Sequence, residues 1–325
     1  MLVAFMGCGG GDATAPIGEN ATALNIAFTA LPTLDASVDG SYEAWAVDAV
    51  GHAHSLGRFS TGSALGIPLT PAGRSASEIW ITVEAPGDND TLPSKQRLLR
   101  GVLHGATADL SVVGALTQGT LTLREHPGQF TMFSPSDNAV NGYPSNEESG
   151  VWLFNMQPRE TDQDDMWVRL SQLNQGWTYE GWMVRDIDSP DAIWLSYGKF
   201  TPDNTGAVNS RDDTGWGPFS GVVNYRTDGE EEFPGDDWIS NPLGLSFPKQ
   251  LTLPLDLREK NASGAVRWTH VITIEPSWKR GEPVGSERPF FIRPYQDSFG
   301  DGDPGTPRSI TFRPTAVPSG HVVIQ

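Results

Sequence analysis

The sequence predicts an all-β protein made of two related β-sandwich domains in tandem, with little helix. Three observations support this class. The 325 residues include 36 glycines and 25 prolines, which helix interiors tolerate poorly. Apolar residues alternate with polar ones in short runs bounded by Gly, Pro, Asn or Asp, as in antiparallel strands. Several runs occur twice in the same order, as expected for two copies of one fold.

The predicted strands are short and are spread along the whole chain. The segments that begin at Tyr42 and Tyr179 carry apolar groups on both faces, which is typical of a strand in the middle of an immunoglobulin-like sandwich. Only Leu92–His104 could form a helix, and Pro93 and Gly101 argue against a long one. The other predicted strands are Leu24–Phe28, Ile79–Val83, Leu110–Val113, Leu121–Leu123, Val151–Phe154, Trp167–Leu170, Ile193–Leu195, Val266–Ile274, Phe290–Pro294 and Ile310–Arg313.

Three blocks make up the internal repeat. They are residues 42–45 with 179–182, residues 55–60 with 196–201, and residues 81–86 with 272–276. They read Tyr-Glu-(Ala/Gly)-Trp, Ser-(Leu/Tyr)-Gly-(Arg/Lys)-Phe-(Ser/Thr) and Ile-Thr-(Val/Ile)-Glu, at offsets of 137, 141 and 191. The growing offset predicts a second copy with longer loops, and 50 of the extra residues fall between the last two blocks.

The repeat divides the chain into four parts. We expect a signal end and Gly-rich tether at 1–20, a first sandwich at 21–125 and a linker or long loop at 126–149. The second sandwich, with its insertions and an acidic C-terminal extension, is then residues 150–325.

Cys8 is the only cysteine, which excludes an internal disulfide and a multi-cysteine metal site. The apolar run before it, Gly7 and the glycines after it resemble the lipobox end of a bacterial lipoprotein signal. That resemblance implies acylation of the Cys8 thiol and a lipid anchor. The alternative is an incidental cysteine near a frayed terminus.

The repeated blocks also resemble a known family. Tyr-Glu-x-Trp, Ser-x-Gly-(Arg/Lys)-Phe and Thr-(Val/Ile)-Glu are similar to the extracytoplasmic C-terminal domain of anti-sigma-K factors and to related bacterial lipoproteins. Residues 233–238 and 287–290 extend the lipoprotein-like match. The resemblance implies a fold and a compartment. It does not extend to sigma-factor inhibition, because the sequence shows no helical sigma-binding region followed by a membrane span. The repeated aromatic residues are interpreted as core residues.

The motifs of common enzymes are missing from the sequence. There is no Gly-x-Ser-x-Gly, His-Glu-x-x-His or phosphate-binding Gly-x-x-x-x-Gly-Lys motif, so we predict no catalytic residues and no cofactor, and therefore not an enzyme. A net charge of −18 also argues against nucleic-acid binding.

One acidic segment is a candidate for a cation. Asp297, Asp301 and Asp303 alternate with glycines and could wrap Ca²⁺. The spacing is not that of an EF-hand, so we predict no metal and keep calcium as the less favoured alternative.

Four aromatic residues lie in the insertion of the second copy. Trp216, Phe219, Phe233 and Trp238 stand among Gly, Pro and acids, and are candidates for contacting a partner. The other interpretation is that they cap their own sandwich.

These observations predict a non-enzymatic, lipid-anchored protein at the periplasmic face of a bacterial membrane. It would dock on a membrane-protein complex and stabilise it, and an electron-transport or photosynthetic assembly is one conceivable host. The alternatives are an envelope sensor related to anti-sigma factors, and a carbohydrate-binding module or hydrolase.

Overall fold

The computed structural model describes residues 20–60, 62, 64–136, 146–153, 168–202, 219, 226–227, 231–232, 234–279 and 288–325, and its fold is all-β. The described helices are α1 (Pro71–Arg74), η2 (Glu147–Ser149) and η4 (Pro314–Ala316). None of the helices in these ranges has the length and apolar character needed to cross a bilayer. The strands are β1 (Ala23–Thr29), β2 (Ser41–Asp48), β3 (Ala53–Phe59), β4 (Ala64–Pro68), β5 (Ala76–Glu84), β6 (Arg97–Val102), β7 (Thr107–Leu110), β8 (Gln129–Met132), β9 (Gly150–Trp152), β10 (Trp177–Arg185), β11 (Ile193–Phe200), β12 (Arg226–Thr227), β13 (Glu231–Glu232), β14 (Gly235–Asp237), β15 (Trp268–Pro276), β16 (Tyr295–Ser298), β17 (Arg308–Ser309) and β18 (Ser319–Ile324).

The internal repeat forms two equivalent antiparallel sheets. One has the strand order β3-β2-β5-β6 and the other β11-β10-β15-β16. The first repeated block lies on β2 and β10, the second on β3 and β11, and the third on β5 and β15. The same register shift occurs between Ala44 and Trp45 in one copy and between Gly181 and Trp182 in the other. The two copies therefore share their strand order, their pairing register and the position of the register shift.

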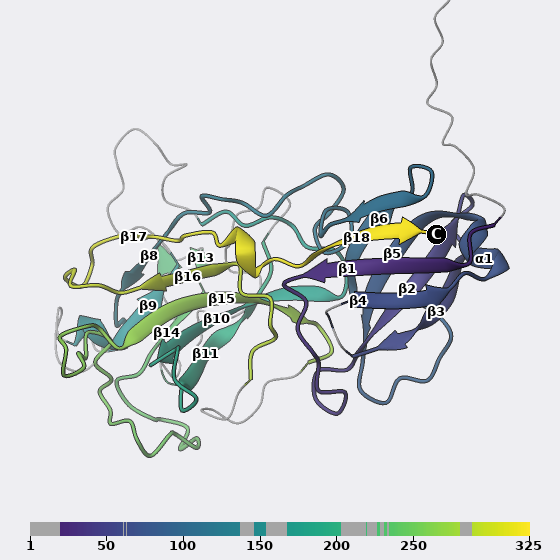
Figure 1. The fold of residues 1–325 in the computed structure, drawn as a ribbon. Helices are drawn as coiled ribbons and strands as arrows, with labels where there is room; N and C mark the ends of the chain where they lie inside the picture. The colour runs from purple at the N-terminus through teal and green to yellow at the C-terminus, as the bar shows by residue number, and fades with distance from the viewer. Residues whose placement is uncertain are drawn as a thin grey trace, which may run out of the picture.

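The two copies are nested along the chain rather than strictly consecutive. A second sheet in the first half has the order β4-β1-β18-β7, so the last strand of the chain lies between β1 and β7. Figure 1 shows β18 beside β1, the first strand of the chain. A fourth sheet, β14-β9-β8-β17, belongs to the second half. The expected ranges differ from this in two places: residues 319–324 return to the first half, and 129–132, within the expected linker, form β8. Below, the first half means β1–β7 with β18, and the second half means β8–β17.

The segment Leu92–His104 is not a helix. Its residues 97–102 form β6, which pairs with β5. Gly101 allows β6 to lie close to β7, because a Cβ at this position would be only 2.5 Å from the carbonyl oxygen of Asp109. The packing of β6 against β7, which requires a glycine at this position, decides the conformation of the segment over its weak helical pattern.

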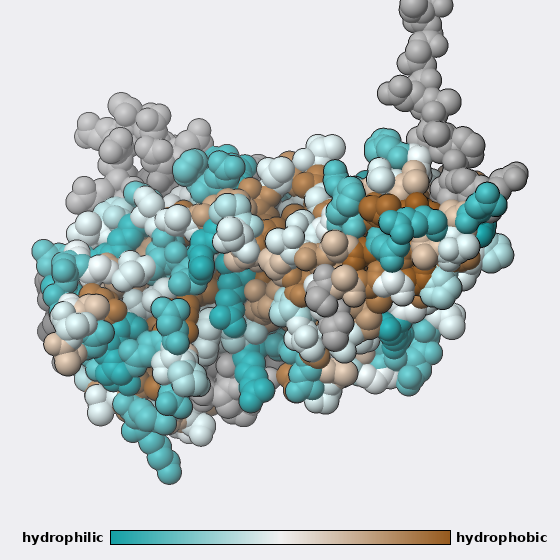
Figure 2. Space-filling model, in the orientation of Figure 1, coloured by the Kyte–Doolittle hydropathy of each residue, from teal (hydrophilic) through white to brown (hydrophobic). Residues whose placement is uncertain are grey.

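Most buried apolar side chains of both halves belong to one hydrophobic core, while Trp182, Val184 and Val271 form a separate cluster. The repeated tyrosines anchor the large core in the same way. Tyr42 donates its hydroxyl to the carbonyl of Pro32 (3.0 Å) and Tyr179 to that of Ser171 (2.8 Å). Between the halves, Gln96 donates to the carbonyl of Gly176 at 3.0 Å. On the surface seen in Figure 2, hydrophilic side chains dominate the second half, whereas hydrophobic groups gather over the first half near β1 and β18.

Candidate functional site

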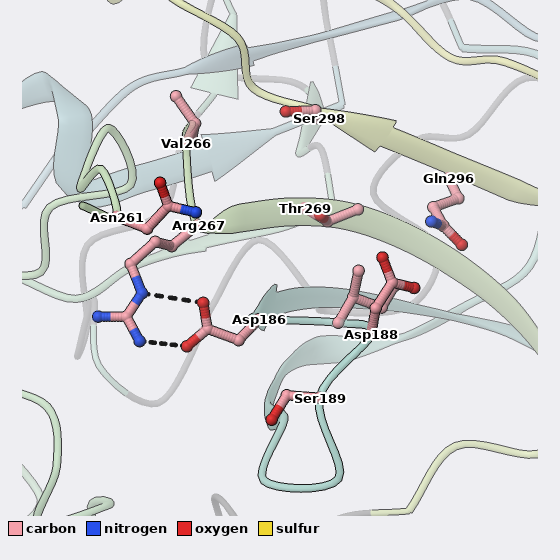
Figure 3. A pocket seen from close by; sticks show the side chains of 10 residues that line it. Asp186, Asp188, Ser189, Asn261, Val266, Arg267, Thr269, Gln296 and Ser298 are labelled. Carbon is pink, nitrogen blue, oxygen red and sulfur yellow. Dashed lines mark hydrogen bonds and ion pairs between the residues drawn. The ribbon is translucent and has the colours of Figure 1, made fainter. Parts of the chain in front are cut away.

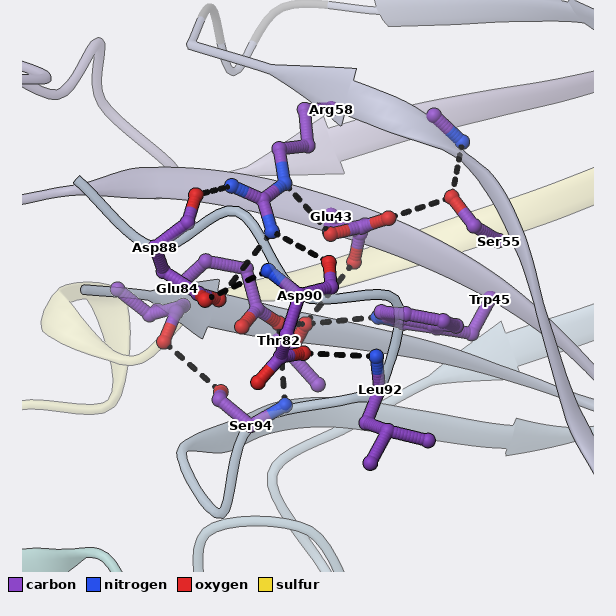
Figure 4. A network of polar contacts seen from close by, with 12 residues as sticks. Glu43, Trp45, Ser55, Arg58, Thr82, Glu84, Asp88, Asp90, Leu92 and Ser94 are labelled. Carbon is purple, nitrogen blue, oxygen red and sulfur yellow. Dashed lines mark hydrogen bonds and ion pairs between the residues drawn. The ribbon is translucent and has the colours of Figure 1, made fainter. Parts of the chain in front are cut away.

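A buried polar chain runs along the outer face of each repeated sheet. In the first half Trp45 donates its indole N–H to Thr82 (Nε1–Oγ1, 2.8 Å), and Thr82 donates to a carboxylate oxygen of Glu84 (Figure 4). The counterparts in the second half are Trp182, Thr273 and Glu275. There the corresponding distances are 2.9 and 2.6 Å. The same donor and acceptor atoms form these hydrogen bonds in both copies. The repeated Trp, Thr and Glu residues therefore link neighbouring strands of each sheet.

A second carboxylate lies on the neighbouring strand and is again repeated. Glu43 accepts a hydrogen bond from Ser55 and pairs with Arg58 (Oε2–Nε, 2.8 Å). Its counterparts are Glu180, Ser196 and Lys199. Glu180 accepts from Ser196 at 2.8 Å, and its distance to Lys199 Nζ is 3.8 Å. Both buried acids therefore make the same structural hydrogen bonds in each copy.

Two buried carboxylates of the second half, those of Glu180 and Glu275, resist ionisation. Burial raises the pKa of Glu180 to about 7, the charge of Glu275 adds to this rise, and Lys199 opposes it. Burial also raises the pKa of Glu275 and, in the first half, that of Glu84. The physical cause is the same in each case: a carboxylate loses more solvation energy on burial than its neutral acid does.

Glu180→Gln should remove a pH dependence of stability. Because the folded-state pKa lies above the usual value of about 4.5, folding takes up a proton between about pH 4.5 and 7. The stabilisation is complete below this window and is lost as the pH rises through it. We expect Glu180 to contribute about 2 kcal/mol to the unfolding free energy that wild-type protein loses between pH 5 and 8, and Glu180→Gln should remove this contribution. Urea unfolding at several pH values measures this. Exposed Asp191→Asn is the control, and parallel wild-type and Glu180→Gln curves would contradict the assignment.

The opposite end of the repeated sheet differs between the copies. In the first half Glu78 of β5 pairs with Arg100 of β6 (Oε2–Nε, 2.7 Å). Strands β15 and β5 align at an offset of 191, so Thr269 takes the place of Glu78. Strands β16 and β6 align at an offset of 196, so Gln296 takes the place of Arg100. A partly exposed ion pair in the first half is thus replaced in the second half by two shorter, neutral side chains.

A pocket of about 440 Å³ occupies this position in the second half (Figure 3). This volume falls in the range typical of ligand sites. It is lined by Asp186, Ile187, Asp188, Ser189, Asn261, Val266, Arg267, Thr269, Gln296 and Ser298. Its walls are the β10–β11 hairpin, which is four residues longer than the β2–β3 hairpin, and the chain that enters β15 from the long insertion. The pocket is therefore built from the parts in which the second copy departs from the first.

Most charges at the rim of the pocket are paired. Arg267 binds Asp186 (Nε–Oδ1, 2.9 Å) and Glu259 (Nη1–Oε1, 2.8 Å), and Arg185 binds Glu259 from the other side at 2.7 Å. The guanidinium of Arg267 holds the pKa of Asp186 below its usual range, and that of Arg185 does the same for Glu259. In the part of the chain that the structure describes, the carboxylate of Asp188 has no such partner, and it projects from the hairpin toward Thr269 and Gln296.

The acidic C-terminal segment makes solvent-exposed ion pairs with the chain before the pocket. Asp301 pairs with Lys260 (2.5 Å) and Asp303 with Arg258 (3.6 Å), in the loop that leads to the pocket. Asp297 instead accepts a hydrogen bond from the backbone N–H of Thr311 (2.9 Å). The three carboxylates considered for calcium thus face different partners, and no cluster of three metal-binding side chains occurs in the described ranges. The structure gives the calcium alternative no support.

The aromatic residues considered as partner contacts divide into two groups. Trp238 and Phe219 are 0% and 1% exposed, and the ring of Phe219 packs against Phe247 (centroids 5.2 Å apart). Their burial agrees with the interpretation that they cap their own core, and it leaves neither ring available to a partner. Trp216, Phe233 and the lipid-attachment residue Cys8 lie outside the described residues.

The pocket is not predictable from any motif in the sequence. Its residues come from the loop after β10 and from β15, β16 and the chain before β15, and no motif joins them. One signal was present. The offset between the repeated blocks grows from 137 to 141 across the first hairpin, which marks four residues that the second copy has gained beside Asp186 and Asp188.

No family model, curated protein or solved structure matches the chain. The similarity to anti-sigma-K domains therefore stays a prediction from the repeated blocks. Together the fold and the site define a duplicated all-β protein with a polar surface pocket in its second half.

Proposed function

We propose that this protein is a non-enzymatic docking protein built as two related β-sandwiches, the second nested in the first. It is held at the periplasmic face of a bacterial membrane by lipid on Cys8. There it binds and stabilises a membrane-protein complex, and the second half supplies the recognition surface.

The observation that carries the proposal is the contrast between the copies. Four buried glutamates of the repeated sheets recur as pairs, Glu43 with Glu180 and Glu84 with Glu275, and each accepts the same structural hydrogen bond in both halves. What is specific to the second half is a longer hairpin and an insertion, which meet around an open pocket. Binding sites commonly lie on loops that a rigid scaffold positions, and a duplicated sheet is such a scaffold.

Cys8→Ser should release the protein from the membrane. Thioacylation needs the cysteine sulfur, so the variant should incorporate no radiolabelled palmitate and should move almost entirely to the soluble fraction. Stable anchoring by lipid chains requires the modification itself, because short apolar runs do not span a bilayer. Thr14→Ser, a mild change in the same tether, is the control. Palmitate incorporation by Cys8→Ser, or unchanged membrane binding, would contradict the anchor.

Docking is tested by affinity purification of wild-type protein from mild detergent extracts. We expect a defined set of membrane proteins at low salt, with recovery that falls as salt is raised, because an acidic surface contributes to association. Recovery of the protein alone at every salt concentration would overturn the proposal.

A carbohydrate-binding module is the second candidate. The hydroxyl and amide groups of Ser189, Asn261, Thr269 and Gln296 in the pocket favour it, since such groups bind sugar hydroxyls. A glycan array separates it from docking, because a docking protein should give no glycan signal.

A further inference from the structure

The pocket lies where the first half places a guanidinium group. Arg100 extends over the outer face of its sheet and is held there by Glu78 through two hydrogen bonds. At the equivalent point the second half has Gln296 and Thr269, and the space that the ion pair fills in one copy is open in the other. The fold thus already contains an arginine-binding position, and in the second copy its own arginine is gone.

A carboxylate is still present at this position. Asp188 projects toward Thr269 and Gln296 from the lengthened hairpin (Figure 3). The other acids nearby, Asp186 and Glu259, are already neutralised by Arg267 and Arg185. Among the described residues that line the pocket, Asp188 is thus an exposed carboxylate without an ion-pair partner, and Thr269 and Gln296 lie on the sheet that it faces. A carboxylate beside neutral oxygen acceptors is a suitable partner for an ammonium or guanidinium group.

We propose that this pocket receives an arginine or lysine side chain of the partner protein, which pairs with Asp188. The inference rests on the proposed docking function and specifies its chemistry. The net charge of −18 agrees with it, because an acidic surface accelerates encounter with a basic partner segment.

The alternative ligand classes fit the pocket less well. A sugar ring usually stacks on an aromatic face, but Trp194, the aromatic residue on this face of β11, already has the guanidinium of Arg293 over its ring at 4.5 Å. An anion would meet Asp188 directly, while the cation nearest to it in the pocket wall, Arg267, is committed to two carboxylates.

The test uses small probes of matched shape on the full chain. N-acetyl-arginine amide, added to isotope-labelled protein, should shift the backbone amide resonances of Asp188, Ser189 and Thr269. The isosteric but neutral N-acetyl-citrulline amide should not. Asp188→Asn should weaken arginine binding by about tenfold or more, because charged hydrogen bonds contribute more than neutral ones. Asp191→Asn, an exposed acid of the same hairpin outside the pocket, is the matched control and should bind as wild type does.

A second variant closes the pocket with the other copy's residues. Thr269→Glu with Gln296→Arg installs the first half's ion pair and should abolish arginine binding while the thermal midpoint stays near that of wild type. Equal shifts from citrulline, shifts from methyl glucoside or sulfate in place of arginine, or full binding by Asp188→Asn would each overturn the proposal.

Affinity purification separates this proposal from the docking function. If wild type and Asp188→Asn recover the same membrane proteins equally, the pocket inference fails and docking stands. If wild type recovers none, the docking function fails and the probe titration still decides whether the pocket binds a cation.

Discussion

Gly181→Ala should destabilise the second half by at least about 3 kcal/mol. A Cβ at this position would lie 1.7 Å from the ring of Tyr197 on the neighbouring strand. Tyr197 cannot easily yield, because it is buried and its hydroxyl is hydrogen-bonded to Nε2 of His270 at 2.9 Å. Urea unfolding followed by tryptophan fluorescence, together with circular dichroism melts, measures the loss.

The first half shows how the clash can be relieved. At the positions of Gly181 and Tyr197 the first half has Ala44 and Leu56. Glycine therefore occurs opposite the large tyrosine ring in the second half, and alanine occurs opposite the smaller leucine in the first. Replacing only Tyr197 by leucine would leave the buried imidazole of His270 without its partner. The equivalent of His270 in the first half is an isoleucine, Ile79.

The triple variant Gly181→Ala, Tyr197→Leu, His270→Ile should therefore recover most of the stability that Gly181→Ala loses. Ala44→Gly is the control in the first half and should cost only about 1 kcal/mol, because it creates a small gap rather than a clash. If the triple variant is as unstable as the single one, the Tyr197 ring is not the obstacle.

The repeat was readable from the sequence because its residues depend on one another. Trp45 needs Thr82 as its hydrogen-bond acceptor, and Thr82 in turn donates to Glu84. A substitution of one of these residues would therefore leave another without its hydrogen-bond partner. The same dependence fixes Trp182 and Thr273. Strands with such requirements keep a recognisable pattern, and the all-β class followed from it together with the turn residues.

The pocket and the aromatic residues could not be read in the same way. The alternation of apolar and polar residues predicts which side chains are buried within a regular strand. Trp238 and Phe219 lie outside the regular strands, so no such alternation predicts whether their side chains are buried. The pocket forms because the second half has smaller side chains where the first half has an ion pair. Thr269 and Gln296 are ordinary strand residues in the sequence. Only the strand register shows that they are equivalent to Glu78 and Arg100.

The nested topology escaped prediction because strand pairing is not local. Residues 319–324 alternate too briefly to stand out, and nothing in their pattern says that their neighbours are β1, some 300 residues earlier, and β7. The structure makes the consequence plain. The two ends of the described chain meet, with Gln325 and Ala23 exchanging backbone hydrogen bonds of 2.9 and 2.8 Å.

Deleting residues 319–325 should therefore unfold the first half, although the deletion lies at the far end of the chain. Val322 and Ile324 are 0% and 6% exposed, and burial of two such side chains is worth about 4 kcal/mol. The deletion also removes the ladders to β1 and to β7 and uncovers Leu24. The total loss approaches the whole stability of a typical domain, about 5–15 kcal/mol.

Hydrogen exchange read by mass spectrometry locates the effect. Peptides from β1, β2 and β5 should lose protection, whereas those from β10 and β15 should keep it, because the second half has its own four-stranded sheets. A permuted chain restores the strand: residues 319–325 are placed before Ala23 through a short turn, which the antiparallel register of β18 and β1 permits. This variant should regain protection in the first half. Full protection of β1 in the deleted chain would show that β18 is dispensable, and the first half would then be complete without the C-terminal strand.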